Sequence, residues 1–130
     1  MKLEALLEKM HDCEGYLERA RAKAFDREVL HERDPQSELD TLAALYFPEL
    51  GSHVRKHSVI YRQQIHAGTI LVVELMKAGD DMGARQSAFD TYMAQMPQRW
   101  AELSTATDEL RAAARRRLVQ IMGVEETSAN

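Results

Sequence analysis

Two histidines, His53 and His57, stand four positions apart in a stretch that reads as helix. That spacing places both imidazoles on one helix face, where they could chelate zinc, nickel or copper. Arg55 and Lys56 lie between them and would repel a cation, and no third or fourth ligand follows at a metal-site spacing. The pattern favours two exposed histidines on a basic face, with a His-based metal site as a weaker alternative.

Catalytic patterns of other kinds are missing or misplaced. Cys13 stands between Asp12 and Glu14, whose charges raise a thiol pKa and reduce its reactivity. The chain has no Gly-x-Ser-x-Gly elbow and no glycine-rich phosphate loop. We therefore expect a protein that is not an enzyme and that needs neither a cofactor nor a metal.

Basic residues gather in the middle of the chain and near its end. No acidic residue occurs from position 51 to position 73. On a helix, Arg55, Arg62 and His66 fall close to one line, in a strip about 16 Å long. Such a strip could bind the phosphates of a nucleic acid or the acidic face of a helix, and a sequence pI near 5.7 favours the helix. The basic-face candidates are Arg55, Lys56, Arg62, His66, Arg111, Arg115 and Arg116.

The first segment carries an apolar stripe on a highly charged surface. Leu3, Leu7, Met10 and Leu17 belong to a series with steps of three and four, typical of a helix that packs along a partner. We expect this helix to run from Lys2 to about residue 33, where Asp34-Pro35 ends it. A helix of that length measures about 45 Å and exceeds a compact globule of this chain. The stripe is therefore a candidate surface for self-association.

A second apolar group, Met93, Met96 and Trp100, lies within two helical turns around Pro97. Ordinary core packing is one interpretation of this group. If the side chains are exposed, they form the best candidate for a protein-binding hot spot, with Trp100 as its anchor.

The remaining elements also read as helices. Ser37 is a candidate N-cap for a short helix, which ends before Pro48 and Gly51. Ser52 is a candidate N-cap for a helix that runs to about residue 78, where Gly79 follows as its C-terminal signal. Residues 69–76 are apolar nearly all round, which predicts a place in the middle of a bundle. A further helix leads to Pro97, where the last helix begins and runs to about residue 122, before Gly123.

Composition limits the class of protein. With 130 residues, 45% hydrophobic and 29% charged, the chain has the size and composition of one globular domain. We expect an all-α, elongated helical bundle of three long helices plus one or two short ones. The domain covers residues 1–123, and residues 124–130 form a flexible tail. A single cysteine, no leader and no apolar run of membrane length indicate a cytoplasmic protein.

Charge is distributed unevenly along the chain. Residues 1–50 carry a net charge of −5, residues 51–100 carry +2 and residues 101–130 carry −1. This polarity suits head-to-tail self-association or one anionic partner. We interpret the protein as a non-enzymatic helical protein–protein interaction module, a regulatory, chaperone-like or assembly subunit whose partner is another protein or itself in a homo-oligomer. The alternative is a helical accessory subunit that binds nucleic-acid phosphates through its basic face.

Overall fold

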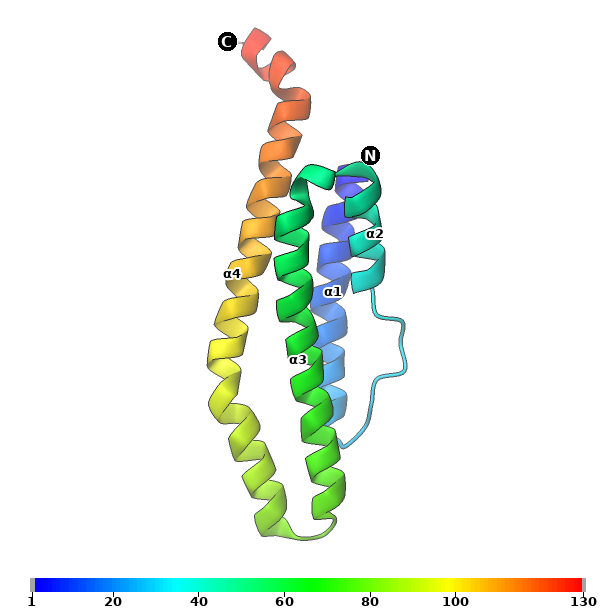
Figure 1. Cartoon of the computed structure of the whole chain (residues 1–130), viewed down its shortest axis with the longest axis vertical. Helices are drawn as coiled ribbons and strands as arrows, with labels where there is room; N and C mark the ends of the chain where they lie inside the picture. Colours follow the sequence, from blue (N-terminus) through cyan, green and yellow to red (C-terminus); the bar gives the residue numbers. More distant parts are fainter. Residues whose placement is uncertain (1, 130) are drawn as a thin grey trace.

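The computed structural model describes the backbone of residues 2–129 and the side chains of residues 2–122. Its elements, in chain order, are α1 (Lys2–Phe25), α2 (Gln36–Tyr46), the short 3₁₀ helix η1 (Pro48–Leu50), α3 (Gly51–Ala78) and α4 (Met82–Ala129). Residues 2–129 contain no strand. The predicted all-α bundle is confirmed, and Figure 1 shows that its helices lie nearly parallel to one long axis.

The main core lies where α1, α2, α3 and the middle of α4 overlap. Leu6, Leu39, Tyr61 and Leu110 are almost completely buried there, one from each of the four helices. Helix α2 is short and lies beside the first half of α1, at the end of the molecule that carries the N-terminus (Figure 1). This end is therefore a four-helix arrangement.

Helix α1 ends at Phe25, eight residues before the expected end. Arg27 adopts a left-handed conformation with φ of 61°. The N–H of Glu28 donates to the carbonyl of Lys23 (2.8 Å), and the N–H of Arg27 donates to that of Ala24 (3.0 Å). These two bonds form a Schellman motif, which satisfies carbonyls at a helix end and usually has glycine where Arg27 stands. The helix is about 36 Å long, so the predicted 45 Å is wrong.

The boundaries of α2 and α3 agree with expectation, but their caps do not. Ser37 and Ser52 lie inside the helices, and neither is an N-cap. The carboxylate of Asp34 instead accepts the N–H of Gln36 at 2.9 Å. Gly79 ends α3 with φ of 56°, as predicted.

Helix α4 is continuous through Pro97, so the predicted helix break there is wrong. Pro97 has no N–H to donate to the carbonyl one turn earlier, and such a helix bends rather than ends when its flanks are packed. Figure 1 shows the bend in the yellow-green part of α4. The helix also passes the stop expected at Gly123 and reaches Ala129. The side chains of the predicted tail, residues 124–130, lie outside the described residues.

Helices α3 and α4 extend beyond the end of α1 as a two-helix arm, formed by residues 69–78 and 82–93 (Figure 1). Phe25 packs against Phe89 and Tyr92 where the arm begins, with ring centroids 6.0 and 5.8 Å apart. The arm has a small core of its own around Leu71, Val72 and Leu75.

The expectation that residues 69–76 lie in the middle of the bundle is wrong in part. Ile70, Val73 and Met76 are exposed on the arm, where α1 no longer lies beside α3. Across the described part of the chain, no helix is long and apolar enough to cross a membrane.

Candidate interaction surfaces

The apolar stripe of α1 faces the chain's own core. Leu3, Met10 and Leu17 are buried, and Leu7 is half-buried against the same cluster. These four side chains are covered by the other helices and are not available to a partner. The first-helix stripe is therefore a packing surface of the monomer.

Three of the seven predicted basic residues are paired with carboxylates of other elements. Lys56 Nζ lies 2.8 Å from Glu109, and a nitrogen of Arg62 lies 3.1 Å from Asp40. A nitrogen of Arg111 lies 2.9 Å from Glu14. These ion pairs lie within one molecule and join α3 to α2 and to α4, and α4 to α1.

Four basic-face candidates remain exposed. Arg55, His66, Arg115 and Arg116 have no carboxylate partner among residues 2–122. They are distributed over α3 and α4, with paired cations between them. The structure therefore leaves single exposed cations rather than one continuous basic patch.

The two histidines proposed as metal ligands have different environments. His57 is only 2% exposed, whereas His53 is half-buried. The Nδ1 atom of His57 has no hydrogen-bond partner, and its ring stacks on Tyr61. No group of three or more potential metal ligands occurs within the described residues. None of residues 2–122 supplies the third ligand that this pair would need.

A polar cluster is buried between α1, α2 and α3. The Gln36 side chain is at its centre, because its oxygen accepts from Cys13 Sγ at 3.7 Å and its nitrogen donates to Asp40 at 2.9 Å. The hydroxyl of Tyr61 donates to Asp34 at 3.2 Å. These bonds fix α2 against the two longer helices.

The groups of this cluster contribute to the structure rather than to a reaction. Burial raises the pKa of the Cys13 thiol to about 12, with a further contribution from Asp34. Its hydrogen-bond partner is an amide oxygen, which cannot act as a general base. Burial also lowers the pKa of His57, against the opposing effect of Asp40. The cluster therefore keeps a protonated thiol and a neutral imidazole in the interior.

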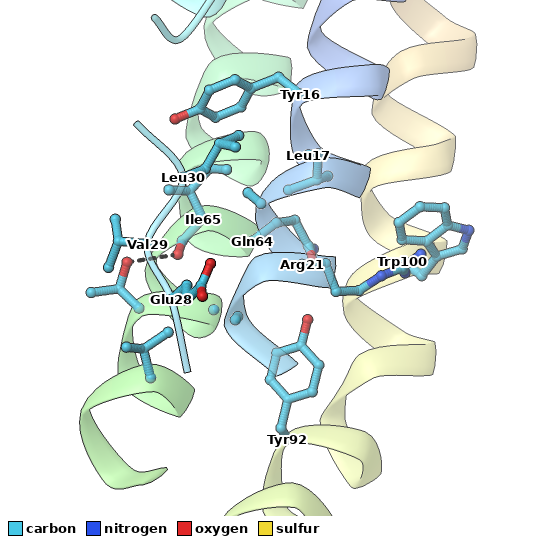
Figure 2. A pocket seen from close by; sticks show the side chains of 15 residues that line it. Tyr16, Leu17, Arg21, Glu28, Val29, Leu30, Gln64, Ile65, Tyr92 and Trp100 are labelled. Carbon is cyan, nitrogen blue, oxygen red and sulfur yellow. Dashed lines mark hydrogen bonds between the residues drawn. The ribbon is translucent and has the colours of Figure 1, made fainter. Parts of the chain in front are cut away.

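The predicted hot-spot group is partly exposed. Trp100 is 42% exposed and Met93 is exposed, while Met96 is half-buried. Figure 2 shows Arg21 reaching from α1 toward the Trp100 ring, with the guanidinium carbon 5.0 Å from the ring centroid. This cation–π contact holds the indole at the edge of the bundle and leaves part of it open to solvent.

A small cavity lies behind Trp100, between α1, α3, α4 and the loop after α1 (Figure 2). Its volume is about 60 Å³, enough for one or two water molecules and too small for an organic ligand. Leu17, Val72 and Tyr92 are among the residues around it. The cavity is a packing defect at the level where α1 ends.

An uncovered apolar surface lies on the arm. Exposed aliphatic side chains occur on both of its helices: Ile70, Val73, Met76, Met82 and Met93. A groove of about 570 Å³ runs between α3 and α4 along the arm and continues past it, where Gln95 and Arg99 line it. Small residues of α4, such as Ala84 and Ala88, line one wall and Ile70 lines the other. Such a wall allows close approach of another helix.

Reasoning from the sequence named Met93 and Trp100 but not Val73, Met76 and Met82. The signal was present, because residues 69–76 are apolar on every side of their helix. That pattern fits a fully buried helix and equally a helix whose cover comes from outside the chain. The position at which α1 ends distinguishes the two interpretations.

Comparisons with protein-family models, curated proteins and solved structures find no match to this chain.

Proposed function

We propose that the protein is a helical assembly module that associates with a second copy of itself through the arm. One observation carries this proposal: α3 and α4 continue beyond α1, and large apolar side chains are exposed there. Soluble monomers seldom expose contiguous apolar surface, and such surface usually marks an interaction site.

Geometry favours a second arm as the partner. Two helices alone cover only part of each other's surface, whereas four helices enclose a core. The part of the arm beyond α1 is about ten residues, or 15 Å, long. Two arms packed side by side would form a four-helix bundle with Val73, Met76 and Met82 inside it. Symmetric pairing of identical chains is the commonest form of oligomer.

Sedimentation velocity with two matched variants tests this proposal. Met76 is 67% exposed and Leu45 is 68% exposed, and both lie in the last turn of a helix. A new glutamate therefore has the same unfavourable interaction with the helix dipole at both positions. We expect Met76→Glu to weaken self-association at least about tenfold because it places a charge in the arm contact. We expect Leu45→Glu to leave it unchanged.

Two results would contradict the proposal. One is a wild-type protein that stays monomeric at the highest concentration reached. The other is an equal effect of the two variants, which would reflect charge alone. Circular dichroism of each variant checks that helicity is retained.

Binding of nucleic-acid phosphates is the second candidate function, favoured by the exposed and unpaired side chains of Arg55, Arg115 and Arg116. Its test is the affinity of the protein for labelled single-stranded nucleic acid. If the phosphates are bound, this affinity falls as salt rises, and the double variant Arg115→Ala, Arg116→Ala binds more weakly. The formal net charge of −4 opposes it. Self-association is therefore the function we favour.

A further inference from the structure

A second groove lies between α2 and α3, at the end of the molecule opposite the arm (Figure 1). Its volume is about 520 Å³. Small or apolar side chains form much of its lining, among them Ala44, Pro48, Val54 and Val59. Val59 is exposed, so the apolar surface is open to solvent.

Two arginines of α3 also line this groove. Arg55 and Arg62 are seven positions apart, which is about 10 Å along a helix. Arg62 forms an ion pair with Asp40, but Arg55 has no carboxylate partner among the described residues. No acid occurs from position 51 to position 73 to balance it on α3. The groove therefore fits a helix that combines apolar side chains with carboxylates.

The end of α4 has this combination. Figure 1 shows α4 extending beyond the rest of the bundle at the end that carries the α2–α3 groove. Val119, Ile121 and Met122 are exposed on this extension. The sequence continues with Glu125 and Glu126. In the sequence, Glu125 stands four positions after Ile121, which is about one turn of an α-helix.

We propose that the end of α4 from one copy, residues 119–129, docks in the α2–α3 groove of a second copy. Residues 119–129 span about 17 Å as a helix, close to the roughly 18 Å of residues 51–62 of α3. Ile121 and Met122 contact the apolar lining, and Glu125 reaches Arg55. Figure 1 shows the end of α4 extending past the bundle and turning away from the side on which α2 lies. The contact therefore joins two molecules, independently of the arm.

Charge reversal in two separate chains tests this contact. Both chains carry Met76→Glu, which weakens the arm contact equally in both, so that differences between them report on the α2–α3 groove. One chain has Arg55→Glu and the other has Glu125→Arg. Alone, each brings like charges together at the contact, and we expect self-association at least about tenfold weaker than in the Met76→Glu parent. Mixed in equal amounts, the two chains pair opposite charges, and association should return to the parent level.

A matched control separates contact from net charge. Arg116 is exposed and unpaired among residues 2–122, so Arg116→Glu changes the net charge as much as Arg55→Glu without altering the groove. We expect it to behave as the parent does. Ile121→Asp should weaken association by a similar factor, because it puts a charge against the apolar lining.

Three outcomes would overturn the proposal: a Met76→Glu parent that is monomeric at every concentration, an Arg116→Glu effect equal to that of Arg55→Glu, or a mixture that associates no better than its separate components. None of them affects the arm, whose own test compares Met76→Glu with Leu45→Glu.

Discussion

The imidazole of His57 stacks on the phenol ring of Tyr61, with ring centroids 5.9 Å apart and an angle of 18° between the planes. Both rings are buried, and they are successive contacts of α3 with the core, one helical turn apart. The Nδ1 atom of His57 has no hydrogen-bond partner. Because the His57 ring is buried and its Nδ1 atom has no partner, the imidazole is stable in the interior only in its neutral form.

Stability should therefore depend on the protonation of His57. Burial lowers its pKa below the ordinary value of 6.5 in the folded protein. The unfolded chain then takes up a proton at a higher pH than the native state does. The contribution is fully present above pH 6.5 and is lost as the pH falls from there to the folded-state pKa, by at most about 1.4 kcal/mol per pH unit.

Urea unfolding between pH 7.5 and 5 measures this effect. We expect His57→Phe, which keeps an aromatic ring against Tyr61, to remove this part of the pH dependence. His66 lies on the same helix but is exposed, so His66→Phe should leave the slope as it is in the wild type. A wild-type slope that survives in His57→Phe would show that other groups cause it.

The hydroxyl of Tyr61 should stabilise the fold through Asp34. Its hydrogen bond spans 3.2 Å and joins α3 to the residue whose carboxylate accepts from the first N–H of α2. Tyr61→Phe leaves the partly buried carboxylate without this donor, and we expect a loss of about 1–3 kcal/mol in the free energy of unfolding. Tyr46 is exposed, so Tyr46→Phe should change stability by less than about 0.5 kcal/mol. Equal effects in urea titrations would contradict the role assigned to Asp34.

Arg27 should be a site where glycine stabilises the protein. A non-glycine residue in the left-handed region costs about 1–2 kcal/mol, and glycine avoids this cost while losing part of the gain through greater freedom in the unfolded chain. We therefore expect Arg27→Gly to raise the free energy of unfolding by up to about 1 kcal/mol. Arg27→Ala removes the same side chain but keeps the Cβ, and it should bring no gain. Parallel urea titrations of the two variants separate backbone conformation from loss of charge.

The Cys13 thiol should be inert in the folded protein. It is 1% exposed, and its pKa is raised to about 12 by burial. At pH 8 we expect a disulfide reagent to react at a rate limited by opening of the structure. Addition of urea above the unfolding midpoint should make the reaction immediate. Rapid labelling of the native protein would show that α2 detaches readily from α1.

The sequence predicts those helix ends that residue type alone decides. Gly79 ends α3 because glycine adopts a positive φ at no steric cost. The end of α1 is different, because Arg27 adopts the same conformation without being the residue type that favours it. Tertiary contacts of Phe25 with Phe89 and Tyr92 accompany this turn, and no local pattern encodes them.

At Pro97 the sequence predicts a helix boundary that the structure does not have. Proline at the start of a helix and proline inside a bent helix have the same local sequence signature. Here α4 has a partner on both sides of the bend, with Phe89 and Tyr92 against Phe25 and with Leu103 in the main core. Gln64 of α3 also donates to the carbonyl of Arg99 at 2.7 Å. Packing therefore keeps the helix continuous.

The candidate surfaces were predicted only in part, for a related reason. The periodic spacing of Leu3 and Met10 predicts that the apolar stripe of α1 packs against another helix. It does not indicate whether that helix belongs to the same molecule or to a partner. The exposure of Met76 and Met82 follows from where α1 ends, and that end was misplaced.

The ion pairs between helices have a consequence for chirality. A chain of four antiparallel helices can close in either of two mirror-related orders, right-turning or left-turning, and apolar packing hardly distinguishes them. Arg62 with Asp40 links α3 to α2, whereas Arg111 with Glu14 and Arg117 with Glu49 link α4 to α1 and to η1. Exposed pairs of this kind add little to stability. In the mirror order each of these side chains would face the other neighbour of its helix, so the pairs favour the observed handedness over its mirror image.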